Sequence, residues 1–320
     1  MTRRLEPATA TFIGAAGNRL AADVFGESGR AVLLLHGGGQ TRHAWRKTAE
    51  RLARAGATAY ALDQRGHGDS DWIADGTYGF AAFAADAAAV ARALAARSGE
   101  RPIAIGASLG GMVALIAEGE AAANGGSAFT ALVLVDITPR VDPAGVAKIQ
   151  GFMRAHAAEG FGSIAEAAEA VASYLPHRPR PRSHEGLRKN LRLHPDGRWR
   201  WHWDPRFLDS ARGAGTGRDQ VEALMTQSAR RVRVPTLLVR GGSSELVQDD
   251  HAREFLDLVP HAEYVDVAGA RHMVAGDSND HFSAAILDFL ARFRRTDDGG
   301  QRSEVRGQRS EVRGQRSEVR

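Results

Sequence analysis

A serine flanked by glycines is the first feature of this sequence that could do chemistry. Ser108 lies in Gly106-Ala107-Ser108-Leu109-Gly110, between apolar runs at 102–105 and 111–117. The first run predicts a buried strand and the second a packed helix, so Ser108 lies at an abrupt turn from strand to helix. The glycines give the backbone room for this turn, and the serine hydroxyl projects from it. The free amides and the dipole at the start of the helix would stabilise an anion that forms beside Ser108.

A serine hydroxyl is a weak nucleophile at neutral pH, so Ser108 needs a nearby base and a carboxylate that orients the base. Histidines, carboxylates and glycines follow several other apolar segments of the chain. They occur in His36-Gly37-Gly38-Gly39, in the loop 63–70, at Asp136, in the loop 241–247 and in Gly269-Ala270-Arg271-His272-Met273. These residues can assist Ser108 only if the fold brings the ends of the strands together.

Predicted strands and helices, which would bring these strand ends together, alternate along the chain. Strands are predicted at 9–15, 20–25, 31–35, 58–62, 101–106, 131–135, 234–241 and 262–267, and helices at 43–55, 79–97, after Ser108, at 249–259 and at 279–293. This alternation predicts an α/β fold with a mostly parallel central sheet of about eight strands and helices on both faces.

The alternation breaks between Pro139 and Val232, where helical patterns occur at 144–158, 163–175 and 185–193. We interpret this stretch as an inserted helical cap over the carboxyl ends of the strands, where open α/β sheets bind ligands. The predicted organisation is therefore a first part of the core at 1–138, a cap at 139–232, a second part of the core at 233–295 and a disordered tail at 296–320. The tail holds three tandem copies of Gly-Gln-Arg-Ser-Glu-Val-Arg, at 300–306, 307–313 and 314–320.

The composition narrows the class of protein. The chain has 320 residues, 43% of them apolar, which is enough for a large core. It has no cysteine, so disulfides, a thiol nucleophile and thiolate metal sites are excluded. The net charge of +4 comes mostly from the arginine-rich tail, so we expect neither a nucleic-acid nor a membrane partner. Without an apolar leader or a membrane span in the sequence, we expect a cytoplasmic protein.

Four landmarks occur in one order: His36-Gly37 after the third strand, the loop 63–70, the Ser108 turn, and Gly269 to Met273 before the last helix. With them, residues 9–294 resemble the α/β-hydrolase superfamily, specifically its cap-bearing serine esterase and lactonase branch, among haloperoxidase-like and epoxide-hydrolase-like sequences. The resemblance implies a nucleophile elbow at Ser108 and a catalytic triad in the order serine, acid, histidine. A serine in the elbow argues against epoxide-hydrolase and dehalogenase chemistry, for which similar chains use an aspartate.

The resemblance also assigns the base and the acid. His272 is predicted as the base, because it lies in a loop after the last strand and the other late histidines fall on predicted helices or their ends. Glu245 is the preferred acid, since it lies in the loop that bears the acid in similar chains, although an aspartate is usual there. Asp136 is the alternative, because relatives sometimes place the acid after that earlier strand. Asp249 and Asp250 also remain open.

Two backbone amides complete the implied site. In similar chains an oxyanion hole uses the amide of the residue after the nucleophile, here Leu109, and one from the loop after the third strand, here Gly38. His36-Gly37-Gly38-Gly39 also resembles the HGGG motif of lipases, which leaves a shift of the second donor by one residue open. Arg65-Gly66-His67-Gly68 resembles a loop that is structural in related chains, with a place at the pocket mouth as the alternative for His67.

Three tryptophans alternate along an extended segment of the predicted cap: Trp199, Trp201 and Trp203. This spacing places three indoles on one side of the segment. We interpret them as packing of the cap against the core, with a wall of the substrate pocket as the alternative.

We therefore expect a serine hydrolase that cleaves a small-molecule carboxylic ester or lactone through an acyl-enzyme intermediate. No metal or organic cofactor is implied. A carbon–carbon bond hydrolase with the same triad and a non-catalytic protein that binds a small ligand are the alternatives. The sequence is compatible with a homodimer and does not identify the natural substrate.

Overall fold

The structure is a computed structural model that describes residues 5–178, 180, 183–210, 217–272 and 279–293. The tail predicted at 296–320, with its three repeats, lies outside the described residues. Met273 of the motif around His272 lies outside them as well.

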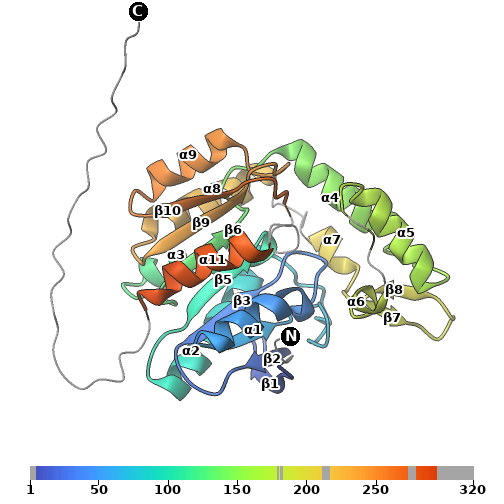
Figure 1. The fold of residues 1–320 in the computed structure, drawn as a ribbon, viewed down its shortest axis with the longest axis horizontal. Helices are drawn as coiled ribbons and strands as arrows, with labels where there is room; N and C mark the ends of the chain where they lie inside the picture. Colours follow the sequence, from blue (N-terminus) through green and yellow to red (C-terminus); the bar gives the residue numbers. More distant parts are fainter. Residues whose placement is uncertain (1–4, 179, 181–182, 211–216, 273–278, 294–320) are drawn as a thin grey trace, which may run out of the picture.

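An eight-stranded sheet forms the centre of the molecule (Figure 1), with the spatial order β1-β2-β4-β3-β5-β6-β9-β10. The strands are β1 (Ala8–Ile13), β2 (Arg19–Phe25), β3 (Ala31–Leu35), β4 (Thr58–Leu62), β5 (Ile103–Ala107), β6 (Leu132–Val135), β9 (Thr236–Gly241) and β10 (Glu263–Val267). Only β2 pairs antiparallel with its neighbours β1 and β4, and all other pairs in this sheet are parallel. The predicted α/β class with a mostly parallel sheet of about eight strands is confirmed.

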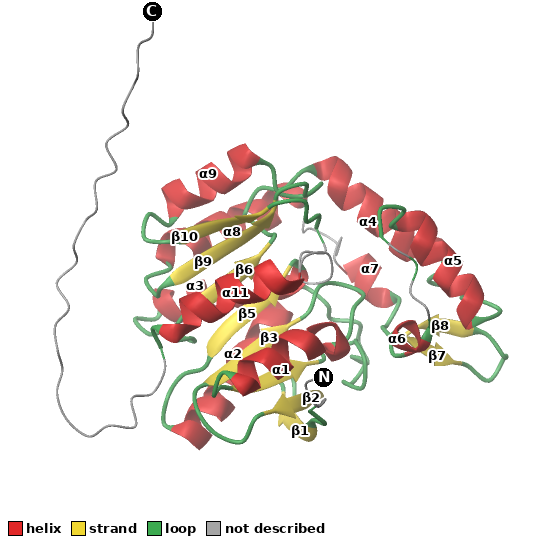
Figure 2. Ribbon diagram, in the orientation of Figure 1, coloured by secondary structure: helices red, strands yellow, loops and turns green. Residues whose placement is uncertain are grey.

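Helices cover both faces of this sheet (Figure 2). They are α1 (Arg46–Arg54), which follows the short 3₁₀ helix η1 (Arg42–Trp45), α2 (Phe80–Ser98), α3 (Leu109–Ala123), α8 (Arg218–Arg231), α9 (Asp249–Leu258) and α11 (Asn279–Ala291). The central strand β3 contributes apolar side chains to both faces of the sheet. Leu33 and Leu35 pack in the apolar cluster that includes α2, α3, α8 and α9. Val32 and Leu34 pack in the cluster that includes α1 and α11. A strand covered on both faces is apolar at every position, which is why residues 31–35 read as an unbroken apolar run.

The stretch between β6 and α8, predicted as a cap and called the cap below, lies at the right of the view in Figure 1. It consists of α4 (Pro143–Ala155), α5 (Ile164–Tyr174), α6 (Glu185–Arg188), β7 (Leu191–Leu193), β8 (Trp199–Trp201) and α7 (Arg206–Ser210). The helix predicted over 185–193 is wrong in its second half. There Leu191–Leu193 pairs with Trp199–Trp201 as an antiparallel hairpin, closed by a turn in which Gly197 has a φ of 79°.

The helix α8 falls within the predicted cap range but packs on the core. A Cβ placed on Gly119 of α3 would lie 2.6 Å from the Cα of Ser228 of α8, so the two helices are in close contact. The cap boundary at residue 232 stays a prediction, but the elements that extend away from the sheet end before α8.

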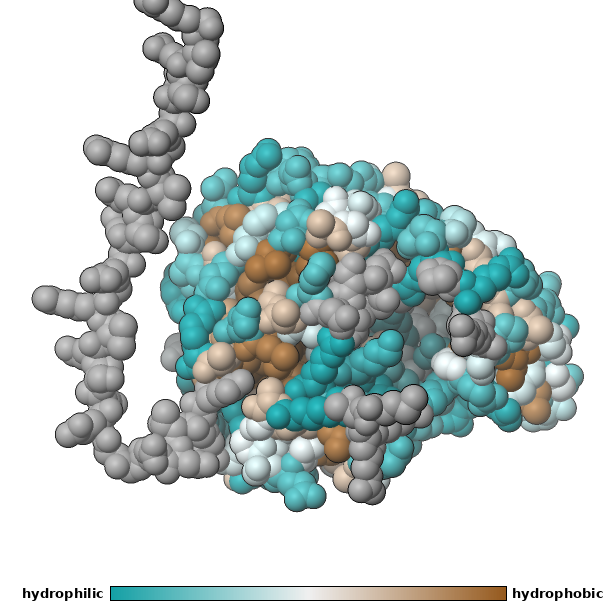
Figure 3. Space-filling model, viewed as in Figure 1, coloured by the Kyte–Doolittle hydropathy of each residue, from teal (hydrophilic) through white to brown (hydrophobic). Residues whose placement is uncertain are grey.

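Within the described residues no helix has the length and apolar character needed to cross a membrane. The face of the molecule in Figure 3 is mostly hydrophilic, and its apolar residues form separate groups.

A buried ion pair fixes the loop after β4 to helix α2. Arg65 donates from Nε and Nη2 to the two carboxylate oxygens of Asp86, each at 2.7 Å, and the two side chains are 2% and 5% exposed. Asp86 also accepts bonds from the Ala15 amide and the Asn18 side chain in the β1–β2 turn. One carboxylate therefore joins three segments that are distant in the sequence.

We expect Asp86→Ala to lower the free energy of unfolding by about 3–5 kcal/mol, because it leaves the Arg65 guanidinium buried without its partner. Urea unfolding of the two proteins measures the difference. The matched control is Glu169→Ala, which breaks a pair with Arg180 whose side chains are 62% and 69% exposed. For this control we expect a loss below about 1 kcal/mol. Equal losses in the two variants would contradict the prediction.

Candidate active site

The carboxyl ends of three parallel strands bring the predicted residues together. In the register of the sheet, Ala107 of β5 lies beside Val135 of β6, and Val135 lies beside Val239 of β9. The Ser108 amide donates to Val135 O at 3.1 Å, and the Asp136 amide donates to Val239 O at 2.7 Å. Ser108 and Asp136 are therefore the first residues beyond two adjacent strand ends.

Ser108 lies in a strained backbone conformation. Its φ of 49° and ψ of −116° fall in a region that favours glycine, and α3 begins at the next residue. A Cβ on Gly106 would lie 2.2 Å from Gly110 O, and one on Gly110 would lie 2.1 Å from Leu35 O. Both glycines are thus required for the strand, the turn and the helix to approach each other this closely.

A hydrogen-bonded network holds the Asp136 carboxylate, whose side chain is fully buried. His272 Nδ1 lies 2.7 Å from Oδ2, which also accepts from Ser244 Oγ at 2.5 Å, and Oδ1 accepts from the Gly241 amide at 2.9 Å. A carboxylate only accepts, so Nδ1 of His272 carries a proton, and in the neutral form of the ring Nε2 has a free lone pair. This is the tautomer that a general base requires.

The structure places the alternative acid, Asp136, and not the preferred Glu245, at the His272 ring. Glu245 lies four residues beyond the end of β9 and pairs with Lys148 of α4 at 3.5 Å. Its backbone supports the start of that helix, because a Cβ on Gly145 would lie 2.2 Å from Glu245 O. The Glu245 carboxylate thus lies beside the Lys148 ammonium and the His272 backbone amide, whereas the Asp136 carboxylate meets the His272 ring. Neither Asp249 nor Asp250 bonds to that ring; they pair with Arg240 and Arg140.

The loop after β3 lies beside Ser108. A Cβ placed on Gly37 would be 3.5 Å from Ser108 Cβ, and one on Gly38 would be 4.0 Å from Leu109 Cβ. Leu109 is the first residue of α3, so its amide has no partner within the helix. The Gly38 amide donates to no described residue. The two amides predicted as an oxyanion hole are therefore close together and free to donate.

Ser108 Oγ and the His272 ring are not hydrogen-bonded to each other, although both are described residues. Hydrogen bonds of this kind are often long in enzymes without substrate and shorten when substrate binds. The structure thus provides the Asp136–His272 pair, with Ser108 at the adjacent strand end.

The comparisons with known proteins agree with this architecture. A family model described as alpha/beta hydrolase fold matches residues 30–278. The chain belongs to this family. It is a hydrolase. The matched range contains the four landmarks of the sequence: His36-Gly37, the loop 63–70, the Ser108 turn and Gly269 to Met273.

Two curated relatives match most of this alpha/beta hydrolase. It is 31% identical over 259 residues to esterase Rv0045c of Mycobacterium tuberculosis, with 79% of this chain and 80% of that protein covered. It is 29% identical over 267 residues to N-formylmaleamate deformylase of Pseudomonas putida, with 83% and 90% covered. The solved structure of E-2-(acetamidomethylene)succinate hydrolase superposes with a TM-score of 0.76 at 23% identity, covering 89% of this chain and 100% of that one. At this identity the superposition shows the common fold.

In this alpha/beta hydrolase, apolar side chains of the cap lie over the glycine loop. A Cβ on Gly39 would be 2.8 Å from Met153 Cε and 3.6 Å from Trp203 Nε1, and one on Gly38 would be 3.4 Å from Phe207 Cζ. Met153 comes from α4 and Phe207 from α7. Side chains of the cap therefore contact the glycine loop that holds the predicted oxyanion site, whose Gly38 and Gly39 stay partly exposed.

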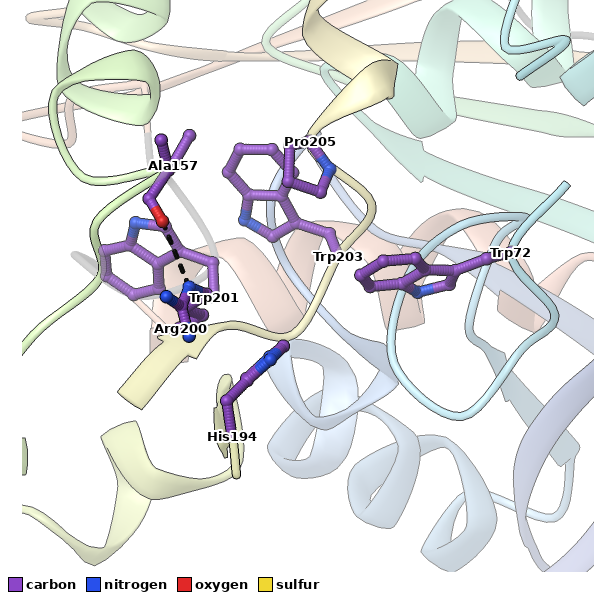
Figure 4. Close-up of a pocket in the computed structure, with 8 residues that line it drawn as sticks. Trp72, Ala157, His194, Arg200, Trp201, Trp203 and Pro205 are labelled. Atoms are coloured by element: carbon purple, nitrogen blue, oxygen red, sulfur yellow. Dashed lines mark hydrogen bonds between the residues drawn. The ribbon is translucent and has the colours of Figure 1, made fainter. Parts of the chain in front are cut away.

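The three tryptophans separate into two environments. Trp201 and Trp203 line a cavity of about 190 Å³ at the junction of cap and core, opposite Trp72 of a core loop (Figure 4). Trp199 does not line it and instead pairs through its backbone with Phe161 of the cap. Neither Ser108 nor His272 lines this cavity, so its role in binding substrate stays a prediction. The extended segment does connect cap and core, because Trp203 also forms a β-bridge with His67.

The sequence reasoning missed Ser244. Its hydroxyl donates to Asp136 and accepts from the amides of Leu246 and Val247, so it fixes one carboxylate oxygen. Its position after the glycines of 241–242 was the only available signal. Among the described residues, no group of three or more His, Cys, Asp or Glu side chains is arranged to hold a metal ion.

Proposed function

We propose that this hydrolase cleaves carboxylic esters or lactones through an acyl-enzyme formed on Ser108. The observation that carries the proposal is the hydrogen bond from His272 Nδ1 to the buried Asp136 carboxylate, next to the strained turn that presents Ser108. The similarity to an esterase over 79% of the chain supports the choice of substrate class.

In the proposed first step, Ser108 Oγ attacks the carbonyl carbon and its proton passes to Nε2 of His272. The carbonyl oxygen becomes an anion, which accepts hydrogen bonds from the amides of Gly38 and Leu109. When the tetrahedral intermediate collapses, the bond to the alcohol breaks and His272 returns the proton to the leaving oxygen. Water then attacks the acyl group with His272 as the base, and the carboxylic acid and free Ser108 result.

Amide hydrolysis is the second candidate, because a relative of similar coverage is named for the deformylation of N-formylmaleamate. The same serine, base and oxyanion site can act on an amide carbonyl. The two reactions differ in the leaving group, because the nitrogen of an amide must be protonated before it departs.

The test of the proposed function is pre-steady-state hydrolysis of p-nitrophenyl acetate. We expect a burst of p-nitrophenolate equal to the enzyme concentration, and an acetyl group on the peptide that contains Ser108 after an acid quench. Turnover without a burst or a labelled serine would contradict the covalent mechanism. Faster cleavage of an N-formyl amide than of the ester favours the second candidate. A vinylogous diketone cleaved in preference to both indicates carbon–carbon hydrolysis, and binding without turnover of any of them indicates a sensor.

A further inference from the structure

The three successive amides of the glycine loop are not equivalent. The Gly37 amide donates to Gln40 Oε1 at 3.0 Å, and the Gly39 amide donates to His67 Nε2 at 3.2 Å. The Gly38 amide between them donates to no residue in the described part of the chain. Because an oxyanion donor acts only if it already points at the developing charge, the two flanking bonds decide whether Gly38 can serve.

His67 is suited to hold one of these bonds. Its side chain is fully buried, and its Nδ1 lies 3.0 Å from Arg65 O. A carbonyl oxygen only accepts, so Nδ1 carries the proton and Nε2 presents its lone pair to Gly39. Burial lowers the pKa of His67 to about 3, and the neighbouring His36 acts in the same direction, so the ring stays neutral and keeps this lone pair at neutral pH.

The surroundings of the ring keep it in place. Phe207 of the cap lies edge-on to His67 with ring centroids 5.0 Å apart, and His36 lies 5.1 Å away on the core side. Phe207 also covers Gly38. The position of Gly39, with a φ of 74°, is thus defined by a ring that is itself held between core and cap.

We propose that His67 is a positioning residue of the oxyanion site: its Nε2 holds the Gly39 amide and thereby directs the free Gly38 amide toward the substrate carbonyl. The inference rests on the proposed function and extends it to a side chain that does not touch substrate. A loop histidine that only fills space would have no effect on the stabilisation of the oxyanion beyond a general loss of stability.

Two substitutions separate these roles. Gln at position 67 places an amide oxygen near the position of Nε2, and Met fills a similar volume without a nitrogen or oxygen acceptor. We expect His67→Met to lower kcat by about 10- to 100-fold with KM changed by less than about threefold, because the donor is displaced rather than removed. His67→Gln should recover most of this loss. A trifluoromethyl ketone, whose adduct with Ser108 carries the oxyanion, should bind more weakly to His67→Met by the same factor as the loss in kcat.

The matched control is Tyr78→Phe. The Tyr78 hydroxyl accepts from the Ile73 amide at 2.8 Å and donates to Asp204 at 2.6 Å, so the variant loosens the same junction of core and cap without removing the acceptor of Gly39. We expect a lower Tm with kcat unchanged.

Amide hydrogen exchange of the peptide that spans residues 36–41 provides a readout independent of activity. Exchange should be faster in His67→Met than in the wild type and normal in His67→Gln. Unchanged exchange and kcat in His67→Met, or equal losses of activity in both variants, would overturn the inference. Acetylation of Ser108 in the wild type is measured in parallel, so that failure of the proposed function is recognised separately.

Discussion

Replacing Ser108 with alanine should lower kcat for ester hydrolysis by about 10⁶-fold, because the nucleophile, base and acid act as a unit and the reaction cannot proceed through an acyl-enzyme without the hydroxyl. The strand end, the oxyanion amides and the Asp136–His272 pair remain in this variant. Steady-state rates with p-nitrophenyl acetate, together with the loss of the burst, measure the effect. A variant that keeps more than a few per cent of wild-type turnover would exclude Ser108 as the nucleophile.

Ser108→Gly is the matched companion of this variant. Glycine adopts a φ of 49° and a ψ of −116° without the steric penalty that a Cβ carries there. We expect Ser108→Gly to be as inactive as Ser108→Ala but more stable than it by on the order of 1 kcal/mol. Thermal or urea unfolding of the two proteins provides the comparison. Equal stabilities would show that the turn is not strained.

Asp136→Asn should lower kcat by about 10⁴-fold, because the amide no longer favours the tautomer of His272 with a free lone pair on Nε2. Asparagine tolerates the positive φ of 50° at this position, so the backbone turn is retained. We expect the loss mainly in kcat, with little change in KM, since the carboxylate does not touch substrate. Kinetics with the same p-nitrophenyl ester measure both constants.

Glu245→Gln is the control for the acid. Its carboxylate lies beside Lys148 and the His272 backbone amide but does not meet the His272 ring, and glutamine keeps an oxygen there, so we expect a change in kcat below about threefold and at most about 1 kcal/mol in stability. A collapse of turnover in Glu245→Gln with an active Asp136→Asn would restore Glu245 as the acid. Loss of activity in both variants would indicate that the loop 241–247 depends on Glu245 for its shape.

The Ser108 turn was predictable because its sequence signal is local. A buried strand, two glycines and a packed helix lie within about fifteen residues of one another, and the approach of Gly106 to Gly110 O falls inside this stretch. The approach of Gly110 to Leu35 O of β3 is a tertiary contact that only the packed sheet shows. The hairpin over 191–201 was missed for the opposite reason. Its strands are three residues long, too short for a period of two to be distinguished from part of a helix.

The choice between Asp136 and Glu245 was not open to sequence reasoning. Each residue follows a predicted parallel strand, and either carboxylate is chemically able to orient an imidazole. The structure shows which carboxylate meets the imidazole. Asp136 follows β6 directly and bonds to the Gly241 amide at the end of β9 and to the His272 ring. Glu245 pairs with Lys148 of α4. The role of His67 at the Gly39 amide was hidden in the same way, since the two residues are brought together only by the adjacent ends of β3 and β4.

The sequence by itself determined the α/β architecture and the position of the Ser108 turn, because apolar periodicity and glycine sterics act over short stretches of chain. Its order of landmarks also indicated a hydrolase. Only the tertiary structure decided which carboxylate meets His272, which glycine amide is free, and which cap side chains cover the loop. These depend on the directions of side chains from strands and helices far apart in the sequence, and such directions are fixed only when the elements pack.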